Sequence, residues 1–375
     1  LGVFDSRLTD NAPGRSEHQM RGKYSSRLSH TIAQLRRLPM NAMLRDMVTW
    51  EPMADPQPGY TPIIGCMASI PEVALANVRL ISRMDLTNAK EVILVFDRPP
   101  ALMPEGFAEQ LEAVRGDVPI RLLHYSDRQH AAADRIRWGW VYAWMSWTTG
   151  IANATTRHII LHDLDAMPIH PAFFEERYQQ AVERDATFYG IRWYQGNGFL
   201  DTDRLTTTFE MVMDAARVRA ESEPHQAFNR IDTLGGRSVE YDTFLYTQRR
   251  LGNAAEAPIG PDDVVHPSQM ICQYTDLLAG RNTHAMPNTN LPLMPAFMSI
   301  GGRDELLATI TRHLEAGGDH RLPFFDAELD VSEVTRPHLD WLEDQARRLE
   351  RAASGDVRPE IDHYLGLLRE RIGHA

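Results

Sequence analysis

The stretch HIILHDLDAMP, residues 158–168, decides the fold of this chain. Its first half is rich in Ile and Leu, which is typical of a buried strand, and Pro168 prevents that strand from continuing. Asp163 and Asp165 therefore lie where the strand ends. Because side chains alternate along a strand, we expect both carboxylates on one side, about 6.5–7 Å apart at Cα. This edge of an open α/β sheet is where ligands bind. A polar turn in which one Asp caps the next helix is the alternative.

Size and charge exclude several classes of protein. With 375 residues, 43% of them hydrophobic, the chain can bury one large core or two modest ones. Its net charge of −12 argues against nucleic acid or an anionic membrane as the main partner. Cys66 and Cys272 form neither a zinc pattern nor a disulfide framework. No apolar run is long enough to span a bilayer. We therefore expect a cytoplasmic protein, at most peripheral to a membrane.

Strand-like and helix-like segments alternate from residue 60 onward. We expect strands over 61–68, 91–96, 119–125, 158–162, 187–194 and 264–265, and helices over 69–83, 107–114, 131–152, 171–184, 203–219 and 243–251. Ser69 is the expected N-cap of the first of these helices. The strands are too apolar to have a solvated face. The pattern therefore predicts an α/β fold, Rossmann-like, with a mostly parallel sheet covered by helices on both faces.

Helical extensions flank this alternating region. The basic amphipathic segment 25–50 predicts one or two helices packed on the core, and prolines and a glycine then break the chain. Further helices are expected over 303–315, over 332–353 and from about 359, whereas 281–296 is expected to be a loop. We therefore divide the chain into an N-terminal helical extension (1–58), an α/β domain (59–278) and a C-terminal loop and helical region packed on that domain (279–375).

Two smaller features are candidates for ligand binding. Arg135 and Arg137 follow the third expected strand, and they either meet a diphosphate or are solvated cations. The loop 195–199 places Asn197 between Gly196 and Gly198, and glycines permit a close approach of the backbone to a ligand.

The order of these parts resembles the GT-A fold of nucleotide-sugar-dependent glycosyltransferases over about residues 60–275. The first element of the resemblance is the apolar strand that ends in Asp163-Leu164-Asp165, after three βα units and before a helix. The second is the acid-rich helix start VEYDT, residues 239–243. The third is Val264-Val265-His266, which is similar to the downstream histidine of many members. On this resemblance, 59–278 is a GT-A catalytic domain.

The resemblance implies a site for Mn²⁺ or Mg²⁺ formed by Asp163, Asp165 and His266. Carboxylate, diphosphate and water oxygens are the ligands that these cations prefer, and an imidazole ligand favours Mn²⁺. A cation there supplies a Lewis acid for the departing nucleoside diphosphate. His284 is a rival for the third ligand.

The resemblance also implies partners: a nucleoside-diphosphate sugar as donor, with UDP or GDP as the nucleotide, and a carbohydrate or other hydroxyl-bearing acceptor. The donor-binding residues would be Ala68, Ser69, Asp97, Arg137, Asp163, Asn197 and Gly198. Of these, Ala68, Ser69 and Asp97 would border the nucleoside, because they lie at the ends of the first two strands. Arg192 and Trp193 would meet the acceptor. The sequence defines neither the sugar nor the oligomeric state.

Asp242 is the expected general base, which takes the proton of the acceptor hydroxyl as that hydroxyl attacks the anomeric carbon. This role predicts inversion of the anomeric centre. Glu240 is the alternative base, and a purely structural alternative is that Asp242 caps the following helix.

Three other functions compete with sugar transfer. A phosphatase of the haloacid-dehalogenase type also uses Asp-x-Asp, but after the first strand and with Thr or Val two positions beyond the second Asp, where this chain has Met167. A nucleotidyltransferase would need a Gly-rich phosphate loop, whereas Gly65 stands alone. A non-catalytic carbohydrate-binding protein of the same fold is the third alternative.

Overall fold

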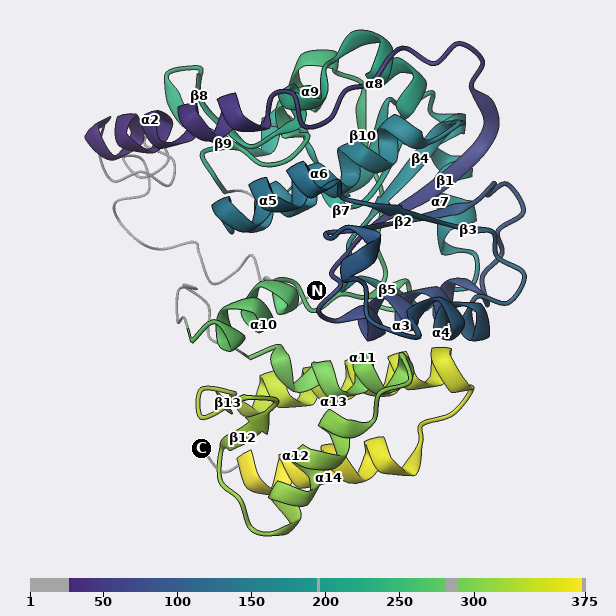
Figure 1. Cartoon of the computed structure of the whole chain (residues 1–375), viewed down its shortest axis with the longest axis vertical. Helices are drawn as coiled ribbons and strands as arrows, with labels where there is room; N and C mark the ends of the chain where they lie inside the picture. Colours follow the sequence, from purple (N-terminus) through teal and green to yellow (C-terminus); the bar gives the residue numbers. More distant parts are fainter. Residues whose placement is uncertain (1–26, 194–195, 281–288, 373–375) are drawn as a thin grey trace.

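The computed structural model describes residues 27–193, 196–280 and 289–372. A seven-stranded sheet forms its centre (Figure 1). In sheet order the strands are β10 (Ala254–Glu256), β6 (Phe188–Arg192), β7 (Thr206–Asp214), β4 (Thr156–His162), β1 (Gln57–Cys66), β2 (Val92–Phe96) and β3 (Ile120–His124). Strands β1 to β4 are parallel to one another, β10 is parallel to β6, and β7 runs antiparallel to both β4 and β6. The mostly parallel sheet that the sequence predicted is confirmed.

Helices cover both faces of the sheet. One face carries α3 (Pro71–Ile81), α4 (Phe107–Val114) and α7 (Phe173–Glu183), and the other carries α5 (Asp127–Ile136), α6 (Gly139–Asn153) and α8 (Ala215–Glu221). Successive residues of β2 alternate between the two cores. Val92, Leu94 and Phe96 pack under the first group of helices, and Ile93 and Val95 pack under the second. This alternation confirms that the sheet has no solvated face at its centre.

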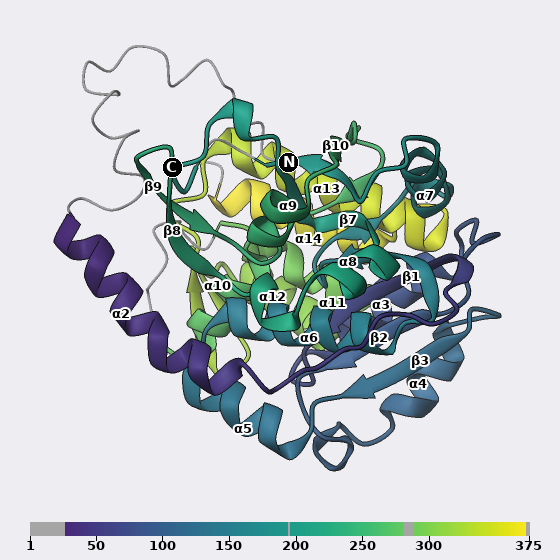
Figure 2. The same ribbon diagram turned by 90° about the horizontal axis from the view of Figure 1, so that it is seen from above.

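Helix α2 (Arg27–Leu44) lies along the rim of the molecule (Figure 2). It packs against α5 and against β8 (Arg230–Leu234), which forms a hairpin with β9 (Arg237–Tyr241). Helix α9 (Leu245–Leu251) follows β9. This hairpin is a feature that the sequence did not predict.

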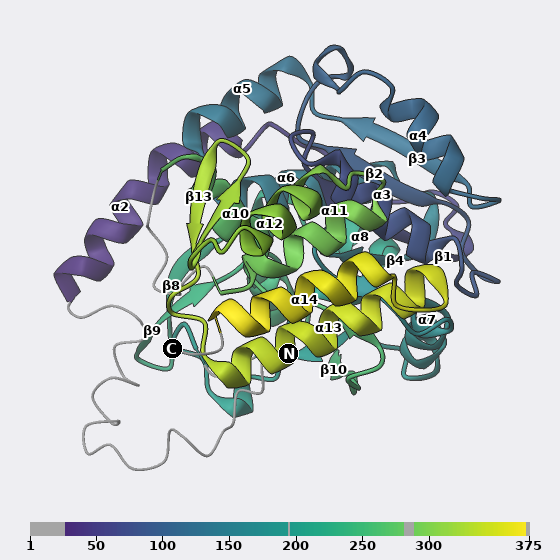
Figure 3. The same ribbon diagram turned by 90° about the horizontal axis from the view of Figure 1, so that it is seen from below.

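The C-terminal part of the chain is helical and adjoins the first face of the sheet. Its elements are α10 (Met270–Leu278), α11 (Met294–Ile300), α12 (Glu305–Glu315), the hairpin β12 (Arg321–Phe324) and β13 (Ala327–Asp330), α13 (Arg336–Ser354) and α14 (Pro359–Ile372). Helices α13 and α14 lie side by side (Figure 3), and α11 packs on α3. Short 3₁₀ turns are η2 (Pro100–Leu102), η3 (Asp201–Asp203), η4 (Pro224–Ala227) and η5 (Leu291–Leu293). The division into three regions stays a prediction.

One prediction about the central sheet is wrong. Residues 203–219 were expected to be one helix, but they form β7 and then α8. The β-branched start and apolar run of β7 are paired on both sides, by β4 and β6, and this tertiary pairing overrides local propensity. Asp214 ends the strand and caps α8, because its carboxylate accepts the N–H of Arg217 at 3.0 Å.

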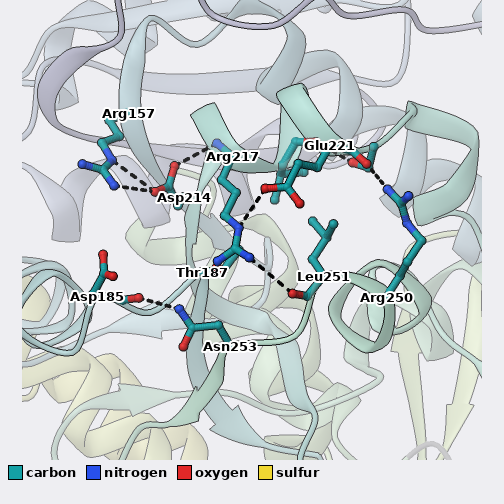
Figure 4. Close-up of polar contacts among 11 residues, drawn as sticks. Arg157, Asp185, Thr187, Asp214, Arg217, Glu221, Arg250, Leu251 and Asn253 are labelled. Atoms are coloured by element: carbon teal, nitrogen blue, oxygen red, sulfur yellow. Dashed lines mark hydrogen bonds and ion pairs between the residues drawn. The ribbon is translucent and has the colours of Figure 1, made fainter.

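Figure 4 shows the polar contacts of this carboxylate. They lie at the edge of the sheet where β4 begins, which is opposite to the edge where β1, β2 and β4 end. Asp214 also accepts from Arg157 at 2.9 Å, and Arg217 reaches Thr187 Oγ1 at 2.6 Å. The network therefore joins β4, β7, α8 and the start of β6.

Three local expectations also need correction. The helix expected over 131–152 is two helices, α5 and α6, because Arg137 adopts a left-handed conformation (φ 51°) that ends α5. Ser69 does not cap α3: Ile70 is its N-cap residue, without a side-chain hydrogen bond, and Pro71 begins the helix. The expected loop over 281–296 ends earlier, since α11 begins at Met294.

Candidate functional site

The two aspartates lie in a tight turn after β4 rather than on the strand itself. The N–H of Asp163 donates to the carbonyl of Phe209 on β7 at 2.9 Å, and the N–H of Ala166 donates to the carbonyl of Asp163 at 3.1 Å. The buried side-chain amide of Asn77 on α3 donates to the carbonyls of Leu164 and Ala166, at 3.3 and 3.0 Å. Hydrogen bonds to β7 and from α3 therefore hold the turn in place.

A second short pairing brings the histidine to the aspartates. Strand β5 (Met167–Pro168) runs antiparallel to β11 (Val264–Val265), with Met167 opposite Val265. His266 follows β11 directly and therefore returns to the Asp-x-Asp turn. Its ring stacks on Phe209, with centroids 4.2 Å apart, and is only 8% exposed. A buried, stacked ring has little rotational freedom, so its position is fixed before any ligand arrives.

Asp163, Asp165 and His266 form one cluster of potential metal ligands, whose donor atoms all lie within 4.8 Å of one another. His266 Nε2 is 3.7 Å from Asp163 Oδ2 and 3.6 Å from Asp165 Oδ1. Donors about 2.1 Å from one ion at neighbouring positions are about 3–3.7 Å apart. The three groups fit one divalent cation with little movement.

The electrostatics of the cluster also favour a cation. Burial and the Asp165 carboxylate raise the pKa of Asp163 to about 7, against the lowering effect of the two nearby histidines, and Asp242 raises it further. Two close carboxylates, one of them buried, disfavour each other's ionised forms, and a divalent cation relieves this repulsion.

The N-terminus of α10 meets the cluster from the other side. The N–H of Ile271, in the first turn of this helix, donates to Asp165 Oδ2 at 3.4 Å. Asp165 is 6% exposed, and the partial positive charge of the helix end stabilises its carboxylate. Its other oxygen, Oδ1, is the atom near His266.

The two candidate bases lie in different environments. Glu240 is fully buried on β9 and forms an ion pair with Arg37 of α2, which also donates to Asn229 Oδ1 at 3.0 Å. Asp242 is partly exposed, and its carboxylate accepts the N–H of Thr243 at 2.6 Å. The N-cap residue of α9 is Phe244, so Asp242 does not cap that helix. The charge of Asp242 contributes to the raised pKa of Asp163, so Asp242 lies near the cluster of potential metal ligands.

The residues expected at the nucleoside lie together at the ends of β1 and β2. Asp97 Oδ1 accepts the backbone N–H of Ala68 at 2.8 Å, and the N–H of Asp97 donates to the carbonyl of Cys66 at 3.1 Å. Burial raises the pKa of Asp97. Ser69 is exposed beside them. The first two strands thus end at the same edge of the sheet as Asp163. Contacts of these residues with a nucleoside stay predictions.

The glycine-containing loop packs tightly against β9. Gly198 has φ +87°, and a Cβ there would lie 2.2 Å from the carbonyl oxygen of Ser238. The carbonyl of Asn197 accepts the N–H of Glu240 at 2.9 Å. This contact places the loop beside the strand that leads to Asp242.

The other expected contacts are less constrained. Arg137 is exposed and lies 3.6 Å from the carboxylate of Asp134. Arg192 is exposed at the end of β6, 3.4 Å from Glu256 of β10. Trp193 packs on an apolar cluster that includes Phe199 and Tyr241. Binding roles for Arg137, Arg192 and Trp193 stay predictions, and His284 lies outside the described residues.

Sequence reasoning missed the buried polar residues on the elements next to the cluster. His162 Nδ1 and Glu210 Oε2 are 2.5 Å apart, directly across β4 and β7, and both side chains are wholly buried. Asn77 is likewise buried in α3. The available signal was a polar side chain inside an otherwise apolar strand or helix, since such groups are buried only with a partner.

No protein-family model matches the sequence, and no curated protein is significantly similar to it. Several solved structures share part of its backbone arrangement. A mannosyltransferase from Pyrobaculum calidifontis, in complex with GDP-Man and Mn²⁺, is 11% identical over 91% of this chain and 83% of that one, with a TM-score of 0.33. The 1–349 fragment of S. aureus TarS is 10% identical over 82% of this chain and 90% of that one, with a TM-score of 0.37.

An active-site mutant of LgtC is 10% identical over 60% of this chain and 80% of that one, with a TM-score of 0.39. Similarities at this level define neither residue roles nor a reaction. The described part of the chain has no helix whose length and hydropathy would suffice to span a bilayer.

Proposed function

We propose that this chain is a glycosyltransferase, which transfers a sugar from a nucleoside-diphosphate sugar to a hydroxyl acceptor and binds Mn²⁺ or Mg²⁺ through Asp163, Asp165 and His266. The observation that carries the proposal is the convergence of these three donors at the sheet edge where β1, β2 and β4 end. A cation bound there would supply a Lewis acid for the diphosphate leaving group. The imidazole ligand favours Mn²⁺ over Mg²⁺.

Binding of the donor uses the neighbouring strand ends. Asp97, held by the N–H of Ala68, borders the nucleoside together with Ser69. Asn197 and Gly198 border the sugar from the loop that packs on β9, and Arg137 is the candidate cation for the diphosphate. Arg192 and Trp193 lie on the acceptor side. A UDP- or GDP-sugar is the donor class that this arrangement fits.

Asp242 acts as the general base. The acceptor oxygen forms a bond to the anomeric carbon while the bond from that carbon to the diphosphate oxygen breaks, and the electron pair leaves with the nucleoside diphosphate. The acceptor proton moves to the carboxylate of Asp242. Attack opposite the leaving group inverts the anomeric centre. Glu240 is unsuited to this step because its carboxylate is already paired with Arg37 in the core.

The competing phosphatase function has no support in the site. The residue two positions beyond the second aspartate, Met167, is fully buried and is paired with Val265, so it presents nothing to a phosphate ester.

Nucleotide binding tests the metal site. We expect calorimetry to detect binding of UDP or GDP only with Mn²⁺ or Mg²⁺, and a panel of sugar nucleotides to contain one that is slowly hydrolysed. Asp165→Ala should abolish both, whereas Glu333→Ala, which removes an exposed acid, should change neither. Binding of the nucleotide without metal, or turnover of simple phosphate esters, would contradict the proposal.

Two further variants test the base. Asp242→Asn should retain metal-dependent nucleotide binding and lose transfer, while Glu240→Gln should retain both. Transfer that survives Asp242→Asn would assign Asp242 a structural role. Analysis of the anomeric configuration of the product then tests inversion.

A further inference from the structure

Helix α2 presents an apolar stripe to solvent. Among the described residues, eight large aliphatic side chains are exposed, and four of them lie on this one helix. Leu28 is 70%, Ile32 41%, Leu35 58% and Leu38 61% exposed. Their spacing of four, three and three places them on a single face. A helix of a globular protein normally turns such a stripe inward, so its outward orientation requires an explanation.

The opposite face of α2 shows that the helix cannot rotate to bury this stripe. Arg37 points inward, where it pairs with Glu240 and its guanidinium lies 5.0 Å from the ring centroid of Trp138. Gln34 donates to the carbonyl of Ile231 on β8 at 3.4 Å, and Leu44 is 1% exposed. Rotation would break a buried ion pair, which is costly because one charge is then left unpaired.

The charge around the stripe is positive, in contrast to the rest of the chain. From residue 27 to residue 45 the sequence has four Arg and no Lys, Asp or Glu, although the whole chain carries −12. One of the four, Arg37, is the buried partner of Glu240. Arg36 and Arg45 are exposed beside the stripe, and Asp46 is the first acid after it. The negative net charge of the chain opposes binding of the whole molecule to anionic surfaces. The exposed face of α2 is an exception, because it is locally basic and apolar.

We propose that α2 docks this protein onto a membrane surface that contains anionic lipids. The helix would lie in the plane of the interface, with Leu28, Ile32, Leu35 and Leu38 among the acyl chains and the exposed arginines at the headgroups, which is the arrangement of interfacial amphipathic helices. Figures 1 and 2 show α2 at the outer rim of the molecule, where a flat surface can reach it. The proposal does not depend on the sugar-transfer reaction.

A second copy of the chain fits this face less well. Two copies joined symmetrically through α2 would bring Arg36 and Arg45 of both together, and like charges at an interface oppose association. Four aliphatic side chains on one helix also fall short of the roughly 800 Å² that each partner buries in a stable interface. An anionic bilayer avoids both difficulties.

Vesicle sedimentation with the full chain tests the proposal. The probes are vesicles of phosphatidylcholine alone and of phosphatidylcholine with phosphatidylglycerol. We expect the protein to sediment with the anionic vesicles, to bind neutral ones weakly, and to be released from the anionic ones by salt. Leu35→Glu/Leu38→Glu should reduce binding at least tenfold. Leu102→Glu/Val182→Glu, which adds the same charge at side chains 51% and 46% exposed elsewhere, should bind as the native chain does.

A charge variant makes the test independent of the leucines. Arg36→Glu/Arg45→Glu should weaken binding to anionic vesicles and leave thermal unfolding unchanged. Three results would overturn the proposal: no binding of the native chain to anionic vesicles, equal loss in the α2 variant and in its matched control, or a native dimer that Leu35→Glu/Leu38→Glu converts to a monomer. The last result would assign the face to a second copy.

Discussion

The side-chain amide of Asn77 donates a hydrogen bond to the carbonyl oxygen of Ala166, which lies 89 residues further along the chain and 3.0 Å away. A second bond from the same nitrogen reaches Leu164. Between these two acceptors lies Asp165, so a helix buried in the core holds the backbone on both sides of the proposed metal ligand. The geometry of the site therefore depends on Asn77, which is not itself one of the proposed metal ligands.

Replacing Asn77 by Ala should weaken metal binding as well as stability. The change leaves two buried carbonyls without their donor, and we expect it to lower the free energy of unfolding by about 1–3 kcal/mol. Because the turn then loses its fixed position, affinity for Mn²⁺ should fall about tenfold, as for other groups that orient metal ligands. Urea unfolding and calorimetric Mn²⁺ titration measure the two effects.

Asn153→Ala is the matched control. Its amide bonds to the carbonyl of Thr149 within α6, distant from the site, at 2.9 Å. It should cost stability without changing Mn²⁺ affinity. Equal Mn²⁺ affinity in native protein and Asn77→Ala would show that the turn does not need the amide.

His266→Phe should change metal preference. The phenyl ring can keep the stacking on Phe209, while the imidazole nitrogen is lost. Since imidazole favours Mn²⁺, affinity for Mn²⁺ should fall more than affinity for Mg²⁺. Competition titrations with the two ions give the ratio. His158→Phe, which replaces a buried histidine at the other end of β4, should leave the ratio unchanged. An unaltered ratio in His266→Phe would exclude this histidine as a ligand.

The sequence predicted those parts of the fold that rest on local pattern. The apolar runs of β1 to β4 were located within a few residues, and α4 was predicted with its observed bounds over Phe107–Val114. Each of these segments has either a continuous apolar run or a helical period that is visible without its neighbours.

The errors arise where distant parts of the chain decide. Strand β7 was mistaken for a helix because its strand state depends on pairing with β4 and β6. The aspartates and His266 were correctly expected to meet, but how they meet depends on the two-residue pairing of β5 with β11. The amide of Asn77 and the pair His162 and Glu210 were not foreseen as supports, because their partners are 48 to 89 residues away in sequence.

The buried pair His162 and Glu210 should be strongly coupled. Removing one member leaves a polar group in the core without its partner, so Glu210→Leu or His162→Leu alone should destabilise the chain by about 1–3 kcal/mol. The double variant should cost much less than the sum of the two. A double-mutant cycle from urea unfolding gives the coupling energy.

The ion pair between Arg321 and Glu328 on the β12–β13 hairpin is the comparison, because both side chains are about 60% exposed. Its coupling should be below about 1 kcal/mol. Similar couplings for the two pairs would show that burial does not strengthen the contact between His162 and Glu210.

Gly198→Ala should distort the loop beside β9. The added Cβ meets the carbonyl oxygen of Ser238, and the positive φ of +87° is itself unfavourable for Ala. Gly236 has a similar φ of +79° but open space around its Cα. We expect Gly198→Ala to cost about 1–3 kcal/mol more than Gly236→Ala, measured by urea unfolding, and to reduce donor binding. Equal costs would mean that the loop moves freely.

Asp97 gives the stability of the fold a pH dependence of defined sign. Burial raises the pKa of Asp97 above its ordinary 3.8 in the folded chain, despite the hydrogen bond from Ala68. Between these two values the folded state binds the proton and the unfolded state does not. The stability contributed by this carboxyl is therefore present below pH 3.8 and is lost as the pH rises through the raised pKa.

Asp97→Asn removes this titration. In urea unfolding between about pH 4 and neutrality, the native chain should lose free energy of unfolding relative to Asp97→Asn as the pH rises. Asp330 gives the opposite sign at lower pH: below about pH 4 the native chain should gain free energy of unfolding relative to Asp330→Asn as the pH rises, because hydrogen bonds from Ser332 lower the pKa of Asp330 below its ordinary 3.8. If the free energies of unfolding of the native protein and of Asp97→Asn change in parallel with pH, the carboxylate of Asp97 is solvated. That result would contradict its burial at the ends of β1 and β2.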